Sequence, residues 1–465
     1  MNKSTEPPKT QRSGSNYVIF LSIVAALGGL LFGYDTAVIS GAIGFLRTYF
    51  VLDSSETGWA ASSALVGCLI GAGTAGGFSD MAGRKKALLL AGFLFTVSAL
   101  WSALANTLTE FSTARILGGV GIGMASMLSP LYIAEIAPAH SRGRLVSFNQ
   151  FAIVVGILVV YFVNYLIANA KSEEWNLQWG WRWMFGSATL PAVLFFVLVF
   201  LIPESPRWLV KRRRSKEALK ILTRMGGQEH AEAELRAIED AVAREEDSTG
   251  QLFQPGMRIA LLIGVVLAIL QQVTGINVFM YYAPEIFKQL GSGTNAALLQ
   301  TIIIGAVNLT FTIVALKTID RLGRKPLMII GSTGMGISLT ALGLAAYFQK
   351  TELWVLIFIL GYIASFALSM GPVVWVVLSE IFPTKIRGRA MSIATLTLWA
   401  ANYLVSQTFP MMNENPWLVE KFNHGFPFAV YALFCVLTIV FVKIFVPETK
   451  GKSLEEIEMS WKKKT

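Results

Sequence analysis

The sequence predicts an all-α integral membrane protein with twelve transmembrane helices in two related six-helix bundles. Hydrophobic residues make up 54% of the 465 residues, charged residues make up 15%, and the mean hydropathy is +0.56. This composition is too apolar for a soluble protein of this size. Each half of the chain also contains six apolar runs of the roughly 20 residues that a membrane-spanning helix needs.

The apolar runs divide the chain into two bundles and a linker. In the first half they cover residues 17–45, 58–77, 87–105, 111–133, 146–168 and 184–202. In the second half they cover residues 257–287, 298–319, 327–348, 353–378, 390–411 and 426–446. We therefore expect a polar N-terminal tail (1–16), a first bundle (17–202), a helical linker (203–256), a second bundle (257–446) and a C-terminal tail (447–465).

Three short charged motifs occur in both halves in the same order. Asp-x-x-Gly-Arg-Lys begins at Asp80 and again at Asp320. Glu-Ile-x-Pro, followed by Arg-Gly-Arg, begins at Glu135 and at Glu380. Pro-Glu follows the sixth run at residue 203 and the twelfth at residue 447. Repeats displaced by about half of the chain indicate duplication of a whole domain, as in many secondary transporters.

The distribution of positive charge predicts the topology. The net charge is +10, and most Lys and Arg residues fall in alternate loops. By the positive-inside rule, both termini and the central linker face the cytoplasm. A nucleic-acid-binding surface would not favour every second loop, so we expect no nucleic-acid partner. Within the linker, residues 216–222 and 231–242 are typical of short amphipathic helices, with a partner helix at 453–461 in the tail; a disordered connector is the alternative.

The repeated charged residues are expected to form a gate on the cytoplasmic face. Glu and Arg residues end or begin neighbouring spans in both halves, so pairs between the halves could hold that face closed. The alternative is that the arginines only set the topology and bind lipid phosphate. The predicted gate residues are Asp80, Arg84, Glu135, Arg144, Asp320, Arg324, Glu380 and Arg389.

Taken together, the motifs resemble those of the sugar porters of the major facilitator superfamily. Besides the three repeats, they include Gln271-Gln272-x-x-Gly275-x-Asn277-x-x-x-Tyr281-Tyr282 in the seventh run. The resemblance extends over about residues 17–461 and is closest to bacterial proton-linked pentose and hexose symporters. It implies alternating access, one neutral sugar bound at mid-membrane, a proton as coupling ion, and no cofactor or metal. It also implies a functional monomer in the lipid bilayer of the bacterial inner membrane.

Asp35 is the candidate proton carrier. It lies in the first apolar run, where a carboxylate costs roughly 2.5–3.5 kcal/mol to insert, so a partner is required. Arg115, near the start of the fourth run, is the candidate cation, and the resemblance pairs these two positions. Proton-coupled members of the family carry Asp at this position, whereas passive members often carry an amide. The alternative is a permanent ion pair that only holds the first and fourth spans together.

Amides and aromatic rings within the apolar runs are the candidate sugar site. Carboxamides offer both donors and acceptors to sugar hydroxyls, and aromatic rings suit the C–H faces of the sugar. With no charged residue among the amides, amino-acid, phosphate and organic-acid substrates are disfavoured. A single helical amide is more often a packing contact. The predicted substrate residues are Phe32, Gln150, Gln271, Gln272, Asn277, Tyr281, Asn308, Trp375 and Trp399.

Two breaks in the spans and two departures from the family pattern complete the prediction. Gly275 is expected to break the seventh span, and Gly371-Pro372 the tenth. Leu398 stands where sugar porters often place Gln or Asn, and Ile157 where xylose-transporting members have Gln. The pocket is therefore less polar than expected for xylose, and glucose or another hexose is an alternative.

A proton–sugar symporter is the leading interpretation, with three alternatives. A proton-independent facilitator of the same fold is the second interpretation, and Asp35 separates the two. A transporter-like sugar sensor is less favoured, since sensors usually carry long cytoplasmic extensions. An enzyme is not expected, because no nucleophile and base set, phosphate loop or metal cluster is recognisable.

Overall fold

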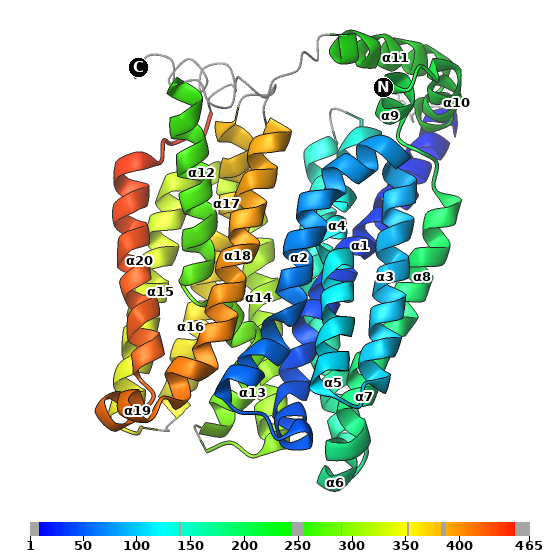
Figure 1. The fold of residues 1–465 in the computed structure, drawn as a ribbon. Helices are drawn as coiled ribbons and strands as arrows, with labels where there is room; N and C mark the ends of the chain where they lie inside the picture. Colours follow the sequence, from blue (N-terminus) through cyan, green and yellow to red (C-terminus); the bar gives the residue numbers. More distant parts are fainter. Residues whose placement is uncertain are drawn as a thin grey trace, which may run out of the picture.

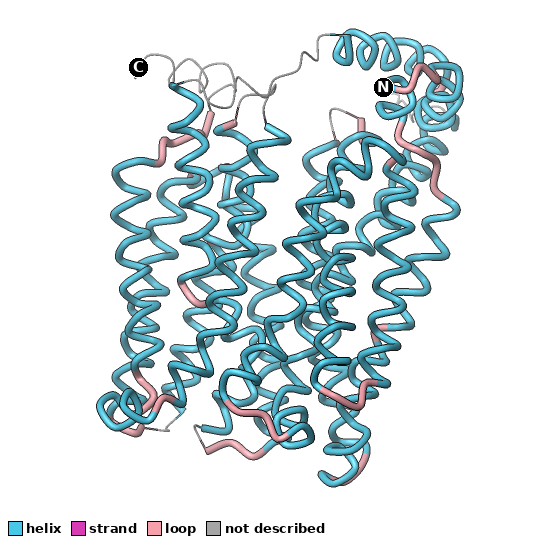
Figure 2. Tube along the Cα trace, in the orientation of Figure 1, coloured by secondary structure: helices cyan, strands magenta, loops and turns pink. Residues whose placement is uncertain are grey.

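The computed structural model describes residues 9–138, 141–243, 255–289, 291–350, 353–382 and 387–451, and these residues are almost entirely helical (Figure 2). The first bundle contains α1 (Lys9–Phe50), α2 (Ser54–Ala82), α3 (Arg84–Leu104), α4 (Leu108–Ile136), α5 (Arg142–Ala170), α6 (Glu173–Trp175), the π-helical turn η1 (Asn176–Gly180), α7 (Trp181–Ser187) and α8 (Thr189–Leu201). The linker contains α9 (Pro206–Lys211), α10 (Ser215–Gly226) and α11 (Gln228–Ala243). The second bundle contains α12 (Pro255–Val273), α13 (Ile276–Gln289), α14 (Thr294–Leu322), α15 (Arg324–Tyr347), α16 (Leu353–Leu368), α17 (Met370–Ile381), α18 (Arg387–Glu414), α19 (Pro416–Phe422) and α20 (Phe426–Phe445).

The twelve-helix, two-bundle fold predicted from the sequence is confirmed. Eleven helical segments in the described part of the chain are long and apolar enough to cross a membrane. The remaining predicted span, the eleventh (α18), is less apolar, yet it packs against α2 and α12 inside the molecule. Its polar side chains bond to protein rather than face lipid: Gln407 contacts α2, and Ser406 bonds to Asn402 of its own helix.

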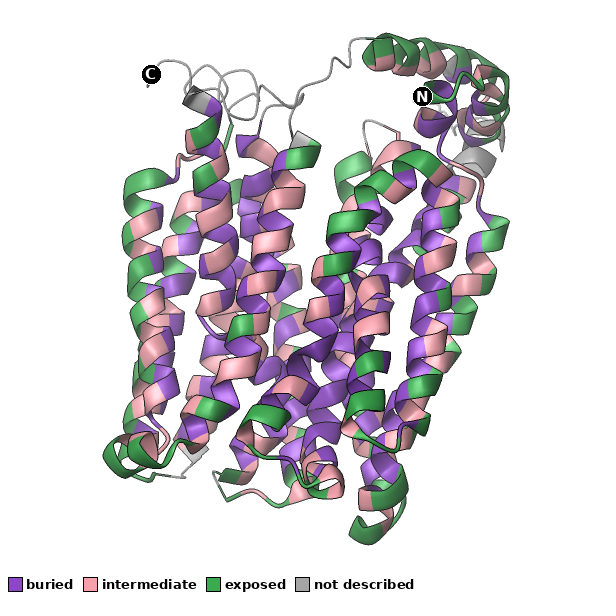
Figure 3. Ribbon diagram, viewed as in Figure 1, coloured by how far each residue is buried: buried purple, intermediate pink, exposed green. Residues whose placement is uncertain are grey.

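The two bundles stand side by side, with α9, α10 and α11 at one end of the first bundle (Figure 1). We call this end, at which α1 begins, the linker side, and the end at which α1 finishes the far side. Contacts between α1 and α13, α2 and α18, and α5 and α14 join the bundles. Buried residues gather in the middle of the molecule and where the bundles meet toward the far side (Figure 3).

Glycines bring α1 and α5 into backbone contact. A Cβ atom on Gly33 would lie 1.9 Å from the carbonyl oxygen of Ile153, and one on Gly156 would lie 2.1 Å from that of Leu30. Small residues allow membrane helices to approach this closely. The side chain of Asn164 also donates to the carbonyl of Val38 at 3.1 Å. These contacts fix the position of the middle of α1.

The repeated motifs cap two helices in the same way. Gly83 and Gly323 have φ values of +102° and +93° and precede α3 and α15. The Glu204 carboxylate accepts from the backbone N–H of Arg84 at 2.8 Å, and that of Glu448 accepts from Arg324 at 3.1 Å. Each carboxylate thus satisfies free N–H groups at a positively polarised helix start. A Cβ on Gly83 would lie 2.1 Å from Glu204, so the motif needs glycine there.

The linker contains helices where the sequence predicts them. α10 and α11 cover the predicted segments 216–222 and 231–242. Trp208 of α9 donates its indole N–H to the carbonyl of Asp80 at 2.9 Å, which ties the linker to the end of α2. The predicted tail helix at 453–461 lies outside the described residues.

Glu448 should stabilise the second bundle in a pH-dependent way. Partial burial raises the pKa of Glu448, but backbone N–H donors of Lys450, Arg324, Lys325 and Thr449 outweigh it and hold the pKa below its ordinary value. The stabilisation is therefore present above the ordinary carboxyl pKa and is lost as the pH falls through the lowered value. We expect Glu448→Gln to cost about 1 kcal/mol of stability near neutral pH.

Thermal unfolding of the purified protein, followed by loss of the monodisperse peak, measures this effect. The difference between wild type and Glu448→Gln should shrink as the pH falls below about 4, because the wild-type carboxyl group becomes neutral too. Asp240→Asn, at an exposed position away from the start of α11, is the control. A difference that stays constant with pH would contradict the role of the charge.

Candidate functional site

Asp35 and Arg115 form a buried ion pair in the first bundle, as predicted. Arg115 of α4 donates from Nη1 to Asp35 Oδ1 at 2.7 Å and from Nη2 to the backbone carbonyl of Asp35 at 2.8 Å. The side chains are 2% and 6% exposed. The guanidinium also lies over the ring of Phe185, 5.3 Å from its centroid. A charge this deeply buried needs its partner, since removing one leaves the other uncompensated.

The second carboxylate oxygen of Asp35 has no hydrogen-bond partner among the described residues. It lies 3.5 Å from the position that a Cβ on Gly118 would take, one turn beyond Arg115. The same Cβ would lie 2.3 Å from the hydroxyl oxygen of Ser98, which donates to the carbonyl of Ala114. Asp35 therefore has one oxygen bound to Arg115 and one oxygen without a hydrogen-bond partner among the described residues.

Three of the predicted amides form a chain around the break in the seventh span. α12 ends at Val273 and α13 begins at Ile276, with Gly275 at φ +92° between them, as expected. Asn277 donates to Gln272 Oε1 at 2.6 Å, and Gln272 donates to Gln271 Oε1 at 3.3 Å. The positive φ requires glycine, and a Cβ at Gly275 would also lie 2.7 Å from the ring of Tyr431.

Gln271, the last of these three bonded amides, supports the break in the tenth span. Gln271 donates to the carbonyls of Met370 at 2.7 Å and Gly371 at 3.1 Å. α16 ends at Leu368 and α17 begins at Met370, so the span is interrupted just before the Gly-Pro pair that predicts the break. Gln271 thus has a structural bond, while Asn277 bonds only to a neighbouring amide of the same set.

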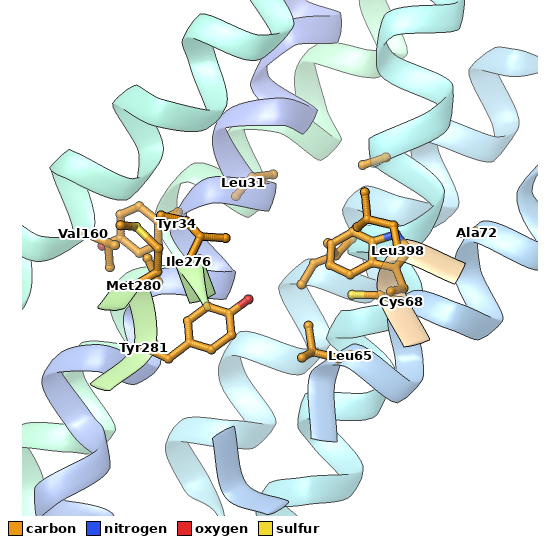
Figure 4. Packing of buried hydrophobic residues seen from close by; sticks show 14 of the residues in the cluster. Leu31, Tyr34, Leu65, Cys68, Ala72, Val160, Ile276, Met280, Tyr281 and Leu398 are labelled. Atoms are coloured by element: carbon orange, nitrogen blue, oxygen red, sulfur yellow. The ribbon is translucent and has the colours of Figure 1, made fainter. Parts of the chain in front are cut away.

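Aromatic residues from the two bundles meet at the interface. Phe32 of α1 and Trp399 of α18 have ring centroids 5.4 Å apart. The indole nitrogen of Trp399 is buried and has no hydrogen-bond partner among the described residues. Tyr281 of α13 is buried and extends its hydroxyl group away from its own helix (Figure 4). A tilted pair of aromatic rings between the bundles, with an unused indole donor, suits a ligand that binds at their interface.

In the part of the chain that it describes, the structure shows no hydrogen bond that joins the remaining predicted substrate residues to the bonded amides. Asn308 of α14 is 9% exposed, whereas Gln150 of α5 and Trp375 of α17 are partly exposed. Their assignment to the sugar site remains a prediction.

Asn402 is a polar residue of this region that the sequence reasoning missed. It lies on α18, one turn beyond Trp399, and is 3% exposed. Its side chain is 3.5 Å from the hydroxyl of Tyr281 and accepts from Ser406 at 3.0 Å. It is an amide in a predicted span, the same signal that indicated the other five.

Leu398 packs at the interface between the bundles. It is 4% exposed and belongs to the apolar cluster that includes Leu65, Cys68 and Ala72 of α2 (Figure 4). Ile157 of α5 is partly buried. The apolar character that both positions predict is therefore present in the structure.

Two of the predicted gate residues, Arg84 and Arg324, pair with acidic residues of their own bundles. Arg84 bonds to Glu135 at 3.1 Å and to Asp80 at 2.9 Å. Arg324 bonds to Glu380 at 2.8 Å and to Asp320 at 3.0 Å. Arg144 and Arg389 are exposed. Arg84 and Arg324 each begin a span whose neighbours in the same bundle end in the acidic residues. The expected pairing between bundles stays a prediction, because the bundles are separated on this side.

The interface between the bundles is closed at the far side. Gln407 of α18 accepts from Ser62 at 2.8 Å and donates to the carbonyl of Ser55 at 2.9 Å. Tyr161 of α5 donates to the carbonyl of Met280 on α13 at 2.7 Å. Arg47 of α1 also pairs with Glu414 of α18.

The same two helices, α2 and α18, separate toward the linker side. A Cβ on Gly58, near the far side, would lie 2.4 Å from the carbonyl oxygen of Gln407. At Gly73 its nearest neighbour would be Leu396, 3.5 Å away, and at Gly76 and Gly77 nothing lies within 4 Å. The contact between the bundles therefore loosens from the far side to the linker side.

The described ranges contain no group of three or more His, Cys, Asp or Glu side chains placed to hold a metal ion. The candidate site instead consists of one buried ion pair in the first bundle, bonded amides at the break in the seventh span, and aromatic rings at the interface. This arrangement can bind a proton on one bundle and a neutral, hydroxyl-rich ligand between the two.

Comparison with known proteins agrees with this geometry. A family model described as "Sugar (and other) transporter" matches residues 21–461. The chain is 48% identical to the D-xylose-proton symporter of Escherichia coli K12, with 97% of each chain covered. It is 45% identical to the arabinose-proton symporter of Bacillus subtilis 168, covering 98% of this chain and 97% of the relative.

A solved structure of the xylose transporter XylE from E. coli, described as a partially occluded inward open conformation, matches with a TM-score of 0.85. The two are 46% identical, and the match covers 94% of this chain and 100% of that chain. The repeated motifs, the twelve-helix architecture and these matches together show that the chain belongs to the sugar transporter family of the major facilitator superfamily.

Proposed function

We propose that this protein imports a neutral monosaccharide together with a proton by alternating access. The observation that carries the proposal is the buried Asp35–Arg115 pair, in which one carboxylate oxygen is bound and the other is free. The names of two relatives, a D-xylose-proton and an arabinose-proton symporter, support the same activity.

Asp35 is the residue that links proton movement to the change of access. Ionised Asp35 balances the charge of Arg115, so the empty carrier keeps a neutral pair inside the membrane. Proton binding neutralises Asp35 and weakens its hold on Arg115. Because α1 and α4 carry the pair, a change in its charge state acts on the helix that also carries Phe32. The proton therefore alters the same helix that faces the sugar.

The sugar binds at the interface between the bundles, where Phe32 and Trp399 meet. Asn277 uses one N–H toward Gln272, which leaves its carbonyl oxygen for a ligand hydroxyl. The indole N–H of Trp399 is a further donor. Aromatic rings on both sides favour the C–H faces of a pyranose over a charged ligand. The substrate is an aldose such as D-xylose or D-glucose, and the apolar Leu398 and Ile157 keep a hexose in consideration.

The linker side is the cytoplasmic side in this proposal. Its loops carry Arg84, Lys85, Arg324 and the basic run of residues 211–214, which suits the positive-inside rule. The bundles touch at the far side and separate toward the linker side, so this conformation faces the cytoplasm. The likeness to a structure described as inward open supports this assignment.

A facilitator that moves sugar without a proton is the competing function. It would need no titratable group in the membrane, and the free oxygen of a buried carboxylate favours the symporter instead. Substitution of Asp35 separates the two functions.

We expect Asp35→Asn to abolish accumulation of sugar against its gradient while sugar exchange at equilibrium continues. Asparagine cannot take up and release a proton, but its amide keeps the size of the side chain. Uptake of labelled aldose into proteoliposomes under a proton gradient, compared with counterflow without one, measures both activities. Asp240→Asn on the exposed surface of α11 is the control. Sugar-driven alkalinisation that persists in Asp35→Asn would exclude Asp35 as the proton carrier.

Replacing Asn277 by Ala should weaken sugar binding by about 1–3 kcal/mol, because sugar hydroxyls lose a partner in a buried site. Gln271→Ala should weaken binding and also lower thermal stability, since Gln271 bonds to the carbonyls at the start of α17. Binding to the purified protein by calorimetry and unfolding temperature are the two measurements. Asn169→Ala, at an exposed amide near the end of α5, is the matched control. Unchanged affinity in Asn277→Ala would assign Asn277 to helix packing.

A further inference from the structure

On the far side, an ion pair joins the last turn of α1 in the first bundle to the last residue of α18 in the second. Arg47 donates from Nη2 to Glu414 Oε2 at 2.7 Å and from Nη1 to Oε1 at 2.5 Å, so the contact is bidentate. The residues are 367 positions apart in the sequence. Their side chains are 42% and 26% exposed, so the pair is half-buried.

The pair lies in a larger contact between the bundles. A small cavity beside it is lined by Thr57 of α2 and by Tyr282 and Phe409 of the second bundle. Glu285 of α13 lies against Gly44 of α1, where a Cβ would be 2.3 Å from its carboxylate, and pairs with Lys288 at 2.9 Å. Arg47 and Glu414 are thus the charged contact between bundles at the point where both bundles pack closely.

We propose that the Arg47–Glu414 pair is the latch that holds the far side closed and sets how often that side opens. The proposal rests on alternating access, which is part of the proposed function. Opening the far side by movement of one bundle against the other must separate α1 from α18, so this pair breaks in every cycle. The pairs of Arg84 and Arg324 lie inside single bundles and survive the same movement.

The chemistry of the pair suits a contact that must also break. Bidentate Arg–carboxylate bonds are strong and directional, and partial burial reduces screening by salt. Both groups reach water when the bundles separate, so the open state regains their hydration. Removing one partner leaves the other without its counter-charge only in the closed state. Neutralising either residue should therefore favour the open far side.

A cysteine reporter tests the latch without any transport step. Thr57→Cys places a thiol in the cavity next to the pair, at a residue that is 5% exposed in the closed state. The native Cys68 and Cys435 are both buried, and the protein without the reporter gives the background. A membrane-impermeant maleimide is applied from the far side. We expect Glu414→Gln and Arg47→Gln to be labelled about fivefold faster than the reporter alone, equal to about 1 kcal/mol.

Two comparisons separate the latch from a local packing defect. Exchange of the charges, Arg47→Glu with Glu414→Arg, should return labelling toward the rate of the reporter alone, whereas each single reversal should speed it. Glu217→Gln removes a similar bidentate partner from Arg214, but that pair lies within the linker. It should leave labelling unchanged.

Equal labelling of the reporter alone and Glu414→Gln would overturn the latch, and so would a charge exchange that rescues nothing. Sugar uptake by the wild-type protein shows whether a failure concerns the latch or the proposed function. If wild-type proteoliposomes show no sugar uptake, the function fails while the labelling result still stands. If uptake is normal, the neutralised variants should bind sugar from the far side with an apparent affinity higher by a similar factor, because a larger fraction is open there.

Discussion

The close contact of α1 with α5 is the constraint on which the rest of the site depends. Gly33 and Gly156 let the two backbones touch, and Asp35 follows Gly33 by two residues. With α1 fixed, the carboxylate of Asp35 can reach Arg115 of α4 inside the bundle. A larger residue at either glycine would move α1 and with it Asp35 and Phe32. Helix packing by small residues thus determines the electrostatics of the site.

Polar contacts fall into two classes according to the bundles that they join. Those of Arg84, Arg115 and Arg324 lie within one bundle and move with it as a unit. Contacts of Arg47 and Gln407 join the two bundles on the far side and must be exchanged for water when that side opens. Contacts of the first class make each bundle rigid. Contacts of the second class are few, and they contribute to the relative stability of the two access states.

The sequence was sufficient for the features that depend on periodicity and repeats. The twelve spans and the linker helices follow from apolar runs and amphipathic patterns, and the break follows from Gly275. The intramembrane charge of Asp35 requires a partner, and the resemblance to the sugar porters indicated Arg115 as that partner. Contacts between the bundles could not be predicted in the same way. Arg47 and Glu414 stand at span ends, where charged residues are common, and nothing local relates positions so far apart. Sequence spacing also does not show which helices are neighbours, so it did not predict that Arg84 and Arg324 pair with acidic residues of their own bundles.

The equivalent helix caps formed by Glu204 and Glu448 have a consequence for how the gene can be divided. Each carboxylate follows the last span of its own bundle and caps the start of the third or ninth span. Each bundle is therefore stabilised by a residue at its own C-terminal end, and neither cap comes from the other bundle. Two polypeptides divided within the linker would therefore each keep the carboxylate that closes them. The arrangement favours assembly of the carrier from separately synthesised halves, and it preserves a trace of the single-bundle ancestor that the duplication implies.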